Sequence, residues 1–312
     1  MAQNRDHGGG LDMAVAQYGG TRANWVDLST GINPMPYPVP PLSDDAWTSL
    51  PDKAAVDRLC AAARRAWRVP DGAAVLATPG ASAAIAQIPR LAAPGRVHIP
   101  APTYNEHAAA FDQNSWQVVT SGDADARVLV HPNNPDGRLW TVHDASAPLT
   151  IIDESFCDVA PQDSLIDQAT QPGTVILKSF GKFWGLAGLR LGFVIGDPDL
   201  VGALSEMLGP WPVSGVALTV GAVALADEAW AQTTRARLAQ DAERLDRLMA
   251  HTGASIVGGT TLFRLYQIND AAAAQDRLAR AHIWSRIFPY SRTWLRLGLP
   301  PAHAWDRIEA AL

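Results

Sequence analysis

The sequence contains very few lysines, and this scarcity is informative. Of the twenty-five cationic residues in the 312-residue chain, only Lys53, Lys178 and Lys182 are lysine; the rest are arginine. An unprotonated lysine amine can form a Schiff base with an aldehyde, whereas a guanidinium stays protonated and does not. Because Lys178 and Lys182 lie four residues apart in a chain that otherwise uses arginine, we expect one of them to have a chemical function.

Cysteines and long apolar runs are also scarce. Cys60 and Cys157 have no metal-ligand spacing and offer no disulfide framework, so a reducing compartment is the simplest expectation. The N-terminal segment MAQNRDHGGG lacks the apolar core of a signal peptide. The longest apolar stretch, near Val213–Ala226, is interrupted by Gly and Thr and is too short to span a bilayer. We therefore expect a cytoplasmic protein that has no contact with a membrane.

The charge pattern lacks any basic block. The net charge is −6, which argues against nucleic acid and anionic membranes and leaves a small molecule as the expected partner. A composition of 47% hydrophobic and 18% charged residues is that of a soluble globular protein. The length allows one large domain and a smaller one.

Short apolar runs alternate with helical patterns through the first two thirds of the chain. Residues 52–68 have helical periodicity between two prolines, and further helices are expected after Gly80, Tyr104, Asp197 and Ser214. The expected strands are Ala74–Ala77, Arg96–Ile99, Gln117–Val119, Val128–Val130, Thr150–Asp153, Thr174–Leu177 and Phe193–Ile195. This alternation predicts an α/β fold with a mostly parallel, doubly wound sheet, whose ligand site lies at the carboxyl ends of the strands.

The chain changes character towards its C-terminus. A long helical pattern runs from about Ser214 to Met249, and alternating runs at Leu262–Ile268 and Trp294–Leu297 follow it. We expect an N-terminal arm over residues 1–45 that packs on the small domain and a large domain over residues 46–213. Residues 214–312 are expected to form a long connecting helix and a small α+β domain.

Polar residues follow the expected strands. The segment 78-TPGASAAI-85 places Gly80, Ala81 and Ser82 at a helix start, where backbone N–H groups can bind an anion, although a capped helix needs no ligand. Tyr104, in 100-PAPTYNEH-107, could stack on a flat ring or simply seal the edge of the sheet. Asn134, in 131-HPNNPDG-137, could bond a ligand oxygen or serve only a turn.

Two further strand ends carry charge. Asp153 closes an apolar strand, where a carboxylate is costly to bury without a partner, although a solvated turn would also explain it. Ser179 and Arg190 flank Lys182, and the glycine-rich 185-GLAGLRLG-192 permits close approach of the backbone.

Together these residues match the needs of pyridoxal 5′-phosphate. The helix start, a serine and an arginine suit its phosphate, and an aromatic residue suits one face of its ring. An asparagine suits its phenolic oxygen, and a carboxylate keeps the pyridine nitrogen protonated, which makes the ring an electron sink. A lysine is required for its aldehyde.

The ordered series G-A-S, P-T-Y, N-N-P-x-G, D-E-x-F and S-x-x-K-x-x-G-L-A-G-L-R-L-G resembles the fold-type I pyridoxal-phosphate enzymes of aminotransferase class I/II. In that family the Schiff-base lysine lies eight residues before the phosphate-binding arginine, which implies the pair Lys182 and Arg190. Lys178 is then interpreted as structural or exposed. The implied cofactor-binding residues are Gly80, Ala81, Ser82, Tyr104, Asn134, Asp153, Ser179, Lys182 and Arg190, with Lys182 and Asp153 catalytic.

Narrower features resemble one branch of the family, the threonine-phosphate decarboxylases of cobalamin synthesis. These features are 7-HGGGLDMAVAQYG-19, 27-DLSTGINPMPYP-38 and the D-E-S-F of residues 153–156, in which Phe156 stands where histidinol-phosphate aminotransferases usually carry tyrosine. The resemblance implies that Arg296 binds the substrate carboxylate. The substrate's own phosphate needs cations, for which His7 and Arg286 are candidates and Arg292 a further candidate, although a frayed terminus would also explain His7 and a solvated surface charge each arginine. Asn33 is also a candidate for substrate binding.

Two departures from the family pattern concern the cofactor phosphate. Leu50 stands where many relatives have a tyrosine that reaches the neighbouring subunit's cofactor, and Gly181 replaces a second phosphate-binding serine. The resemblance still implies a homodimer. An aminotransferase of the histidinol-phosphate type and a non-catalytic pyridoxal-phosphate-binding module remain as alternative functions.

Overall fold

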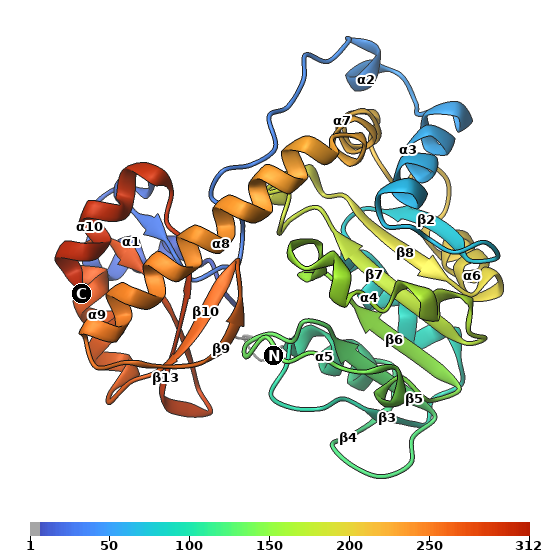
Figure 1. Ribbon diagram of the computed structural model, residues 1–312. Helices are drawn as coiled ribbons and strands as arrows, with labels where there is room; N and C mark the ends of the chain where they lie inside the picture. The colour runs from blue at the N-terminus through green and yellow to red at the C-terminus, as the bar shows by residue number, and fades with distance from the viewer. Residues whose placement is uncertain (1–6) are drawn as a thin grey trace. The chain divides into compact units, whose positions relative to one another are not determined.

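The computed structural model describes residues 7–312, which fall into two units (Figure 1). The larger unit comprises Pro36–Asn134 and Arg138–Gln232. The smaller unit comprises the described residues up to Met35 together with Pro135–Gly137 and Thr233–Leu312.

The larger unit contains a seven-stranded sheet in the order β2-β8-β7-β6-β5-β3-β4, in which only β8 runs antiparallel to its neighbours. Its strands are β2 (Ala74–Thr78), β3 (Arg96–His98), β4 (Gln117–Val119), β5 (Ala126–Val130), β6 (Leu149–Asp153), β7 (Thr174–Ser179) and β8 (Gly192–Gly196). Its helices are α2 (Asp45–Thr48), α3 (Lys53–Ala66), α4 (Ala81–Gln87), α5 (Asn105–Gln113), α6 (Pro198–Leu208) and α7 (Gly215–Ala226). The predicted fold class, a mostly parallel sheet with helices, is confirmed.

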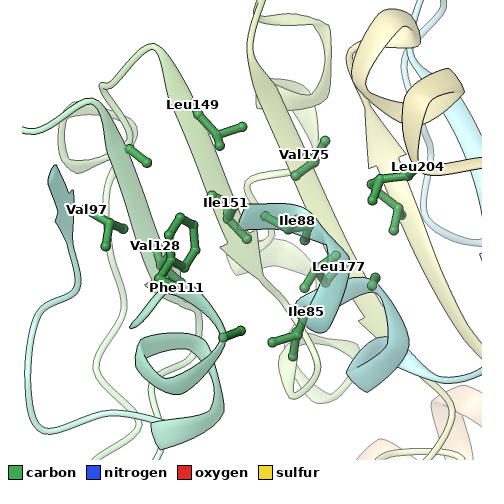
Figure 2. Close-up of a cluster of buried hydrophobic side chains, with 14 of the residues drawn as sticks. Ile85, Ile88, Val97, Phe111, Val128, Leu149, Ile151, Val175, Leu177 and Leu204 are labelled. Carbon is green, nitrogen blue, oxygen red and sulfur yellow. The ribbon is translucent and has the colours of Figure 1, made fainter. Parts of the chain in front are cut away.

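The central strands are buried along almost their whole length because both faces of the sheet are covered. Every residue of β6 and β8 is buried, as are the first five residues of β7. On the face covered by α4 and α5, Ile85 and Phe111 from the helices pack with Ile151, Val175 and Leu177 from the strands (Figure 2).

The sheet topology gathers particular residues at one edge. The parallel strands β5, β6 and β7 end there, at Val130, Asp153 and Ser179 respectively. Because β8 is antiparallel, it begins at this same edge, and the residues just before Gly192 lie beside the ends of the parallel strands. The carboxyl ends of parallel strands are the usual place for ligands in such sheets.

The smaller unit contains a four-stranded antiparallel sheet in the order β12-β13-β10-β9. Its strands are β9 (Ser255–Thr260), β10 (Phe263–Gln267), β12 (Arg286–Phe288) and β13 (Ser291–Gly298). The N-terminal strand β1 (Val26–Asp27) pairs in parallel with β11 (Ile283–Trp284). The remaining helices of this unit are α1 (Leu11–Tyr18), α9 (Ala271–Arg280) and α10 (Trp305–Ala311).

The long helical pattern after Ser214 is divided in two, contrary to expectation. Helix α7 ends at Ala226, and α8 (Glu228–His251), whose residues belong to both units, begins after Asp227. The Asp227 side chain accepts a hydrogen bond from the Trp230 backbone N–H at 2.9 Å, which caps the second helix. Within residues 7–312, no helix is both long enough and apolar enough to cross a bilayer.

Candidate active site

A pocket lies at the edge of the larger unit's sheet where the parallel strands end. Its empty space, including the part open to solvent, is about 640 Å³, within the usual range for cofactor sites. Eight of the nine residues expected to hold the cofactor line it: Ala81, Ser82, Tyr104, Asn134, Asp153, Ser179, Lys182 and Arg190. Gly181, one of the two departures from the family pattern, and Phe156 also line it.

Gly80, the ninth residue, shapes the pocket by having no side chain. It has a φ of +81°, and a Cβ there would lie 2.5 Å from Nη2 of Arg190. Arg190 itself adopts a left-handed φ of 52°, unusual for a non-glycine residue, and donates a hydrogen bond to the Ala187 carbonyl at 3.0 Å. A Cβ on Gly192 would lie 2.4 Å from the Ala81 nitrogen. Two glycines therefore allow the arginine and the start of α4 to converge.

Asp153 is buried and held on both carboxylate oxygens. Its Oδ2 lies 2.8 Å from Nε2 of His107, and its Oδ1 accepts hydrogen bonds from the Ser155 hydroxyl at 2.6 Å and the Ser155 backbone N–H at 3.0 Å. Burial alone would raise the pKa of this carboxyl, but the hydrogen bonds from His107 and Ser155 outweigh it and lower the pKa. Asp153 is therefore a fixed anion at neutral pH.

His107 was not expected from the sequence. It lies on α5, one helical turn after Tyr104, and its side chain is buried. Since an ionised carboxylate can only accept a hydrogen bond, Nε2 carries the proton that bonds Asp153. One signal in the sequence favoured His107, namely its position three residues after Tyr104. Residues three apart share a helix face, so a residue there can lie near the same ligand.

Lys182 reaches the pocket from the loop that follows β7. Its carbonyl accepts a hydrogen bond from Gly185 N–H at 3.1 Å, and Leu186 N–H donates to the Phe180 carbonyl at 3.1 Å, which shapes this turn. Its Nζ lies 5.3 Å from the centre of the Phe156 ring. Phe156 is buried and has no hydroxyl with which to bond a ligand.

Tyr104 and Asn134 lie on loops that are joined to each other. Asn133, which precedes Asn134, accepts a hydrogen bond from the Thr103 hydroxyl at 2.6 Å. It also donates to the Pro102 carbonyl at 3.0 Å. Asn133 was not expected from the sequence, and it connects the loop that carries the aromatic residue to the loop that carries Asn134.

Lys178 lies away from the pocket and is neither exposed nor isolated. It is 2% exposed, and its ammonium group lies 2.5 Å from a Glu154 carboxylate oxygen. Successive residues of a strand point to opposite faces, so Lys178 and Ser179 face opposite sides of the sheet. Of the two interpretations offered for Lys178, the exposed one is wrong, because the side chain is buried in an ion pair.

The four expected substrate-binding residues belong to the smaller unit. The His7 carbonyl accepts a hydrogen bond from Arg286, and Asn33 accepts one from Arg237 at 2.7 Å. Arg296 is buried and donates to the Ser29 carbonyl at 2.7 Å. Arg292, the further candidate, precedes Arg296 on β13 and is exposed.

Arg286 and Arg296 are direct cross-strand partners in the β12–β13 pair. Side chains opposite each other in an antiparallel pair point to the same face of the sheet, and like charges in this arrangement are destabilising. The smaller unit thus places two arginines opposite each other on neighbouring strands, and Arg286 donates to the carbonyl of His7. Such an arrangement suits a ligand that has more than one negative charge.

The pocket of the larger unit fits pyridoxal 5′-phosphate. Arg190, Ser179 and the start of α4 could hold the phosphate, and the absence of side chains at Gly80 and Gly192 keeps that space open. The buried anion of Asp153 suits the pyridine nitrogen, and Lys182 suits the aldehyde.

Comparison with known proteins agrees with this fit. Residues 60–312 match the family model described as aminotransferase class I and II, and the chain belongs to this family, whose members use pyridoxal 5′-phosphate.

Two curated relatives match nearly the full length of the chain. A threonine-phosphate decarboxylase of Sinorhizobium sp. is 41% identical over 96% of this chain and 95% of its own. Another, of Pseudomonas aeruginosa, is 39% identical over 98% of this chain and 97% of its own. Among solved structures, the histidinol-phosphate aminotransferase of Sinorhizobium meliloti in complex with pyridoxal-5′-phosphate has a TM-score of 0.82. It is 21% identical over 97% of this chain and 93% of its own, which shows the shared fold.

Proposed function

We propose that the protein decarboxylates L-threonine O-3-phosphate to (R)-1-amino-2-propanol O-2-phosphate, a step of cobalamin biosynthesis. Two relatives with this activity in their names match the chain at 41% and 39% identity over nearly its whole length. The structural observation that carries the proposal is the cross-strand pair of Arg286 and Arg296, because this substrate has two anionic groups.

We assign the substrate carboxylate to Arg296 and the substrate phosphate to Arg286 together with His7. The planar guanidinium of Arg296 can bond a carboxylate through two parallel N–H donors. Arg286 donates to the backbone of His7, so a group bound by one can be reached by the other. A phosphate and a carboxylate between these cations would also relieve the repulsion of the arginine pair.

When bound, pyridoxal 5′-phosphate supplies an electron sink for the pair released when the bond between Cα and the carboxylate breaks. Asp153 would hold the pyridine nitrogen with its negative charge, and His107 and Ser155 keep that carboxylate in place. Carbon dioxide leaves, and Lys182 Nζ delivers a proton to the substrate Cα in its place.

The experiment that tests this function uses no keto acid. The holoenzyme is mixed with threonine phosphate alone, and carbon dioxide and the absorption spectrum are followed together. Continuous release of carbon dioxide with an unchanged resting spectrum is expected. Stoichiometric conversion of the cofactor to its pyridoxamine form, with a keto acid needed to restart, would instead identify an aminotransferase.

A matched pair of variants tests the assignment of the phosphate. Threonine lacks the phosphate, so it should be a much poorer substrate in turnover as well as in binding, because remote binding energy helps to align the scissile bond. Arg286→Ala should reduce the ratio of kcat/KM for threonine phosphate to kcat/KM for threonine. Arg280→Ala is the control, because it removes an exposed arginine that is paired with Asp276 on α9. It should leave this ratio of kcat/KM values unchanged.

We further propose that the enzyme is a cytoplasmic homodimer. Free Cys60 and Cys157 suit a reducing compartment. The larger unit exposes the large apolar side chains of Trp47, Leu50 and Val223, which are 70%, 68% and 45% accessible, and burial of these side chains in an interface would remove them from water. Sedimentation analysis at micromolar concentration should give twice the chain mass; a fully active monomer would contradict this.

A further inference from the structure

The second lysine, Lys178, belongs to a buried cluster of charges on the face of the sheet opposite the pocket. Its ammonium group lies 2.5 Å from Glu154 Oε2 and 3.8 Å from Asp158 Oδ1. The three side chains are at most 4% exposed. Burial alone would lower the pKa of Lys178, but the two carboxylates outweigh this and raise it. The carboxyl pKa of Glu154 is lowered in turn, so this ion pair is charged at neutral pH.

The remaining hydrogen-bonding capacity of the two carboxylates is used. Glu154 accepts from the Ser164 hydroxyl at 2.7 Å and from Leu165 N–H at 2.6 Å. Asp158 accepts from the indole N–H of Trp67 at 2.8 Å and from that of Trp184 at 3.0 Å. Ion pairs and hydrogen bonds of this kind fix the positions of the groups that they join. A protein in which apolar residues of equal volume replace a buried ion pair is often just as stable. The cluster therefore contributes to geometry more than to stability.

Each member of the cluster is linked to a residue that lines the pocket. Glu154 directly follows Asp153 on the chain, and Lys178 directly precedes Ser179. Since adjacent residues of a strand point to opposite faces, an ion pair on one face restrains the neighbouring side chains on the other.

The third link runs through Trp184, which lies two residues after Lys182. Its ring is stacked between Phe180 and Trp230, with centroid separations of 5.2 Å and 5.3 Å. Its carbonyl accepts a hydrogen bond from Tyr37 N–H at 2.9 Å. Edge contacts with Tyr37 and Phe183 also surround the ring, and the hydrogen bond to Asp158 adds the directional restraint on its position within the plane.

We propose that Asp158, held by Lys178, is a positioning residue that sets the place of Lys182 through the indole of Trp184. The cluster touches neither substrate nor cofactor. Its effect is expected on the environment of the Lys182 nitrogen and on kcat, since a displacement of about 1 Å can cost about a hundredfold in rate. The KM for the substrate should change little.

The chain offers a matched pair of variants for the test. Trp184→Phe and Trp67→Phe each remove one indole N–H donor from the same carboxylate and keep an aromatic ring. Only Trp184 lies on the loop that carries Lys182, because Trp67 caps the C-terminal end of α3. If the charge cluster contributed only to stability, the two variants would change the properties of Lys182 to the same extent.

The readout is the pH at which the visible absorption of the lysine-bound cofactor changes, which reports on the Lys182 nitrogen whichever reaction the enzyme catalyses. Trp184→Phe should move this midpoint by about half a pH unit or more, since one unit corresponds to 1.36 kcal/mol between the two protonation states. It should also lower kcat about 10- to 100-fold. Trp67→Phe should keep the wild-type midpoint. Equal midpoints in both variants would overturn the proposal, even if both lose thermal stability.

A second variant keeps the test decisive if Trp184→Phe does not fold. The double substitution Lys178→Met with Glu154→Gln removes both charges of the ion pair together, so that Glu154 is not stranded. It also removes the cation that holds Asp158, which keeps its two indole donors. The proposal expects the same displacement of the midpoint as in Trp184→Phe. A wild-type midpoint in a folded double variant would show that the cluster is only structural.

Discussion

Replacement of Asp153 by asparagine tests the centre of the site, because it removes the anion and keeps the shape. The carboxylate accepts three hydrogen bonds, one from His107 and two from Ser155. An asparagine can turn its oxygen to only one side. If it faces His107, its amide group then opposes the Ser155 backbone N–H, a donor that would remain unsatisfied at a cost of about 1–3 kcal/mol in stability.

The effect on turnover should be larger than the effect on folding. Removing one partner of a buried charge pair typically costs about 3–5 kcal/mol. At 1.36 kcal/mol per tenfold in rate, this corresponds to a loss of about two to nearly four orders of magnitude. The low pKa of Asp153 means that the wild-type group is ionised throughout the assay range, so no titration of this residue should appear near neutral pH.

The assay measures carbon dioxide release at saturating threonine phosphate, with cofactor occupancy read from the visible spectrum. Ser155→Ala is the matched control, because it removes one hydrogen bond to the same carboxylate and keeps its charge. We expect a loss of about tenfold or less in the control, from a hydrogen bond worth about 1.5 kcal/mol. Near-normal turnover of a fully loaded Asp153→Asn enzyme would refute the role given to this residue.

Further predictions concern the two lysines and the acid limb of stability. Lys182→Ala should lose the covalent link to the cofactor, as measured by mass after borohydride reduction. Lys178→Ala should keep this link. It should instead lose about 3–5 kcal/mol of stability, because Glu154 is left as a buried charge without its partner. Equal loss of the link in both would refute the assignment of the lysines. The folded pKa of Glu154 is lowered, so its stabilisation is present above the unfolded value of about 4.3 and is lost as pH falls below it. Thermal midpoints measured between pH 6 and pH 3 should therefore fall less steeply in Glu154→Gln than in the wild type.

The sequence predicts the pocket well because its residues come from strand ends. Short apolar runs can be located from composition, and the parallel topology brings the ends of such runs to one edge. Asp153 and Ser179 close β6 and β7, and Arg190 precedes β8, so each could be placed from the order of the strands alone.

Other features depend on contacts that no local pattern contains. His107 is one polar residue of an ordinary amphipathic helix, and only the packing of α5 against the sheet brings it to Asp153. The pairing of Arg286 with Arg296 depends on the register of β12 and β13, which shifts between Ile287 and Phe288. A shift of one residue reverses the face to which a side chain points, so this pairing could not be predicted from spacing.

The opposite faces of adjacent strand residues explain why the chain keeps two lysines so close together. At the ends of β6 and β7, Asp153 faces the pocket while Glu154 faces the buried cluster, and Ser179 and Lys178 divide in the same way. Lysine suits the cluster because its compact ammonium group can approach two carboxylates at once, whereas a planar guanidinium would need a wider site. Lys182 is needed for a different reason, since only an amine can be joined to an aldehyde and later carry a proton. The same residue type therefore has two different physical justifications four positions apart.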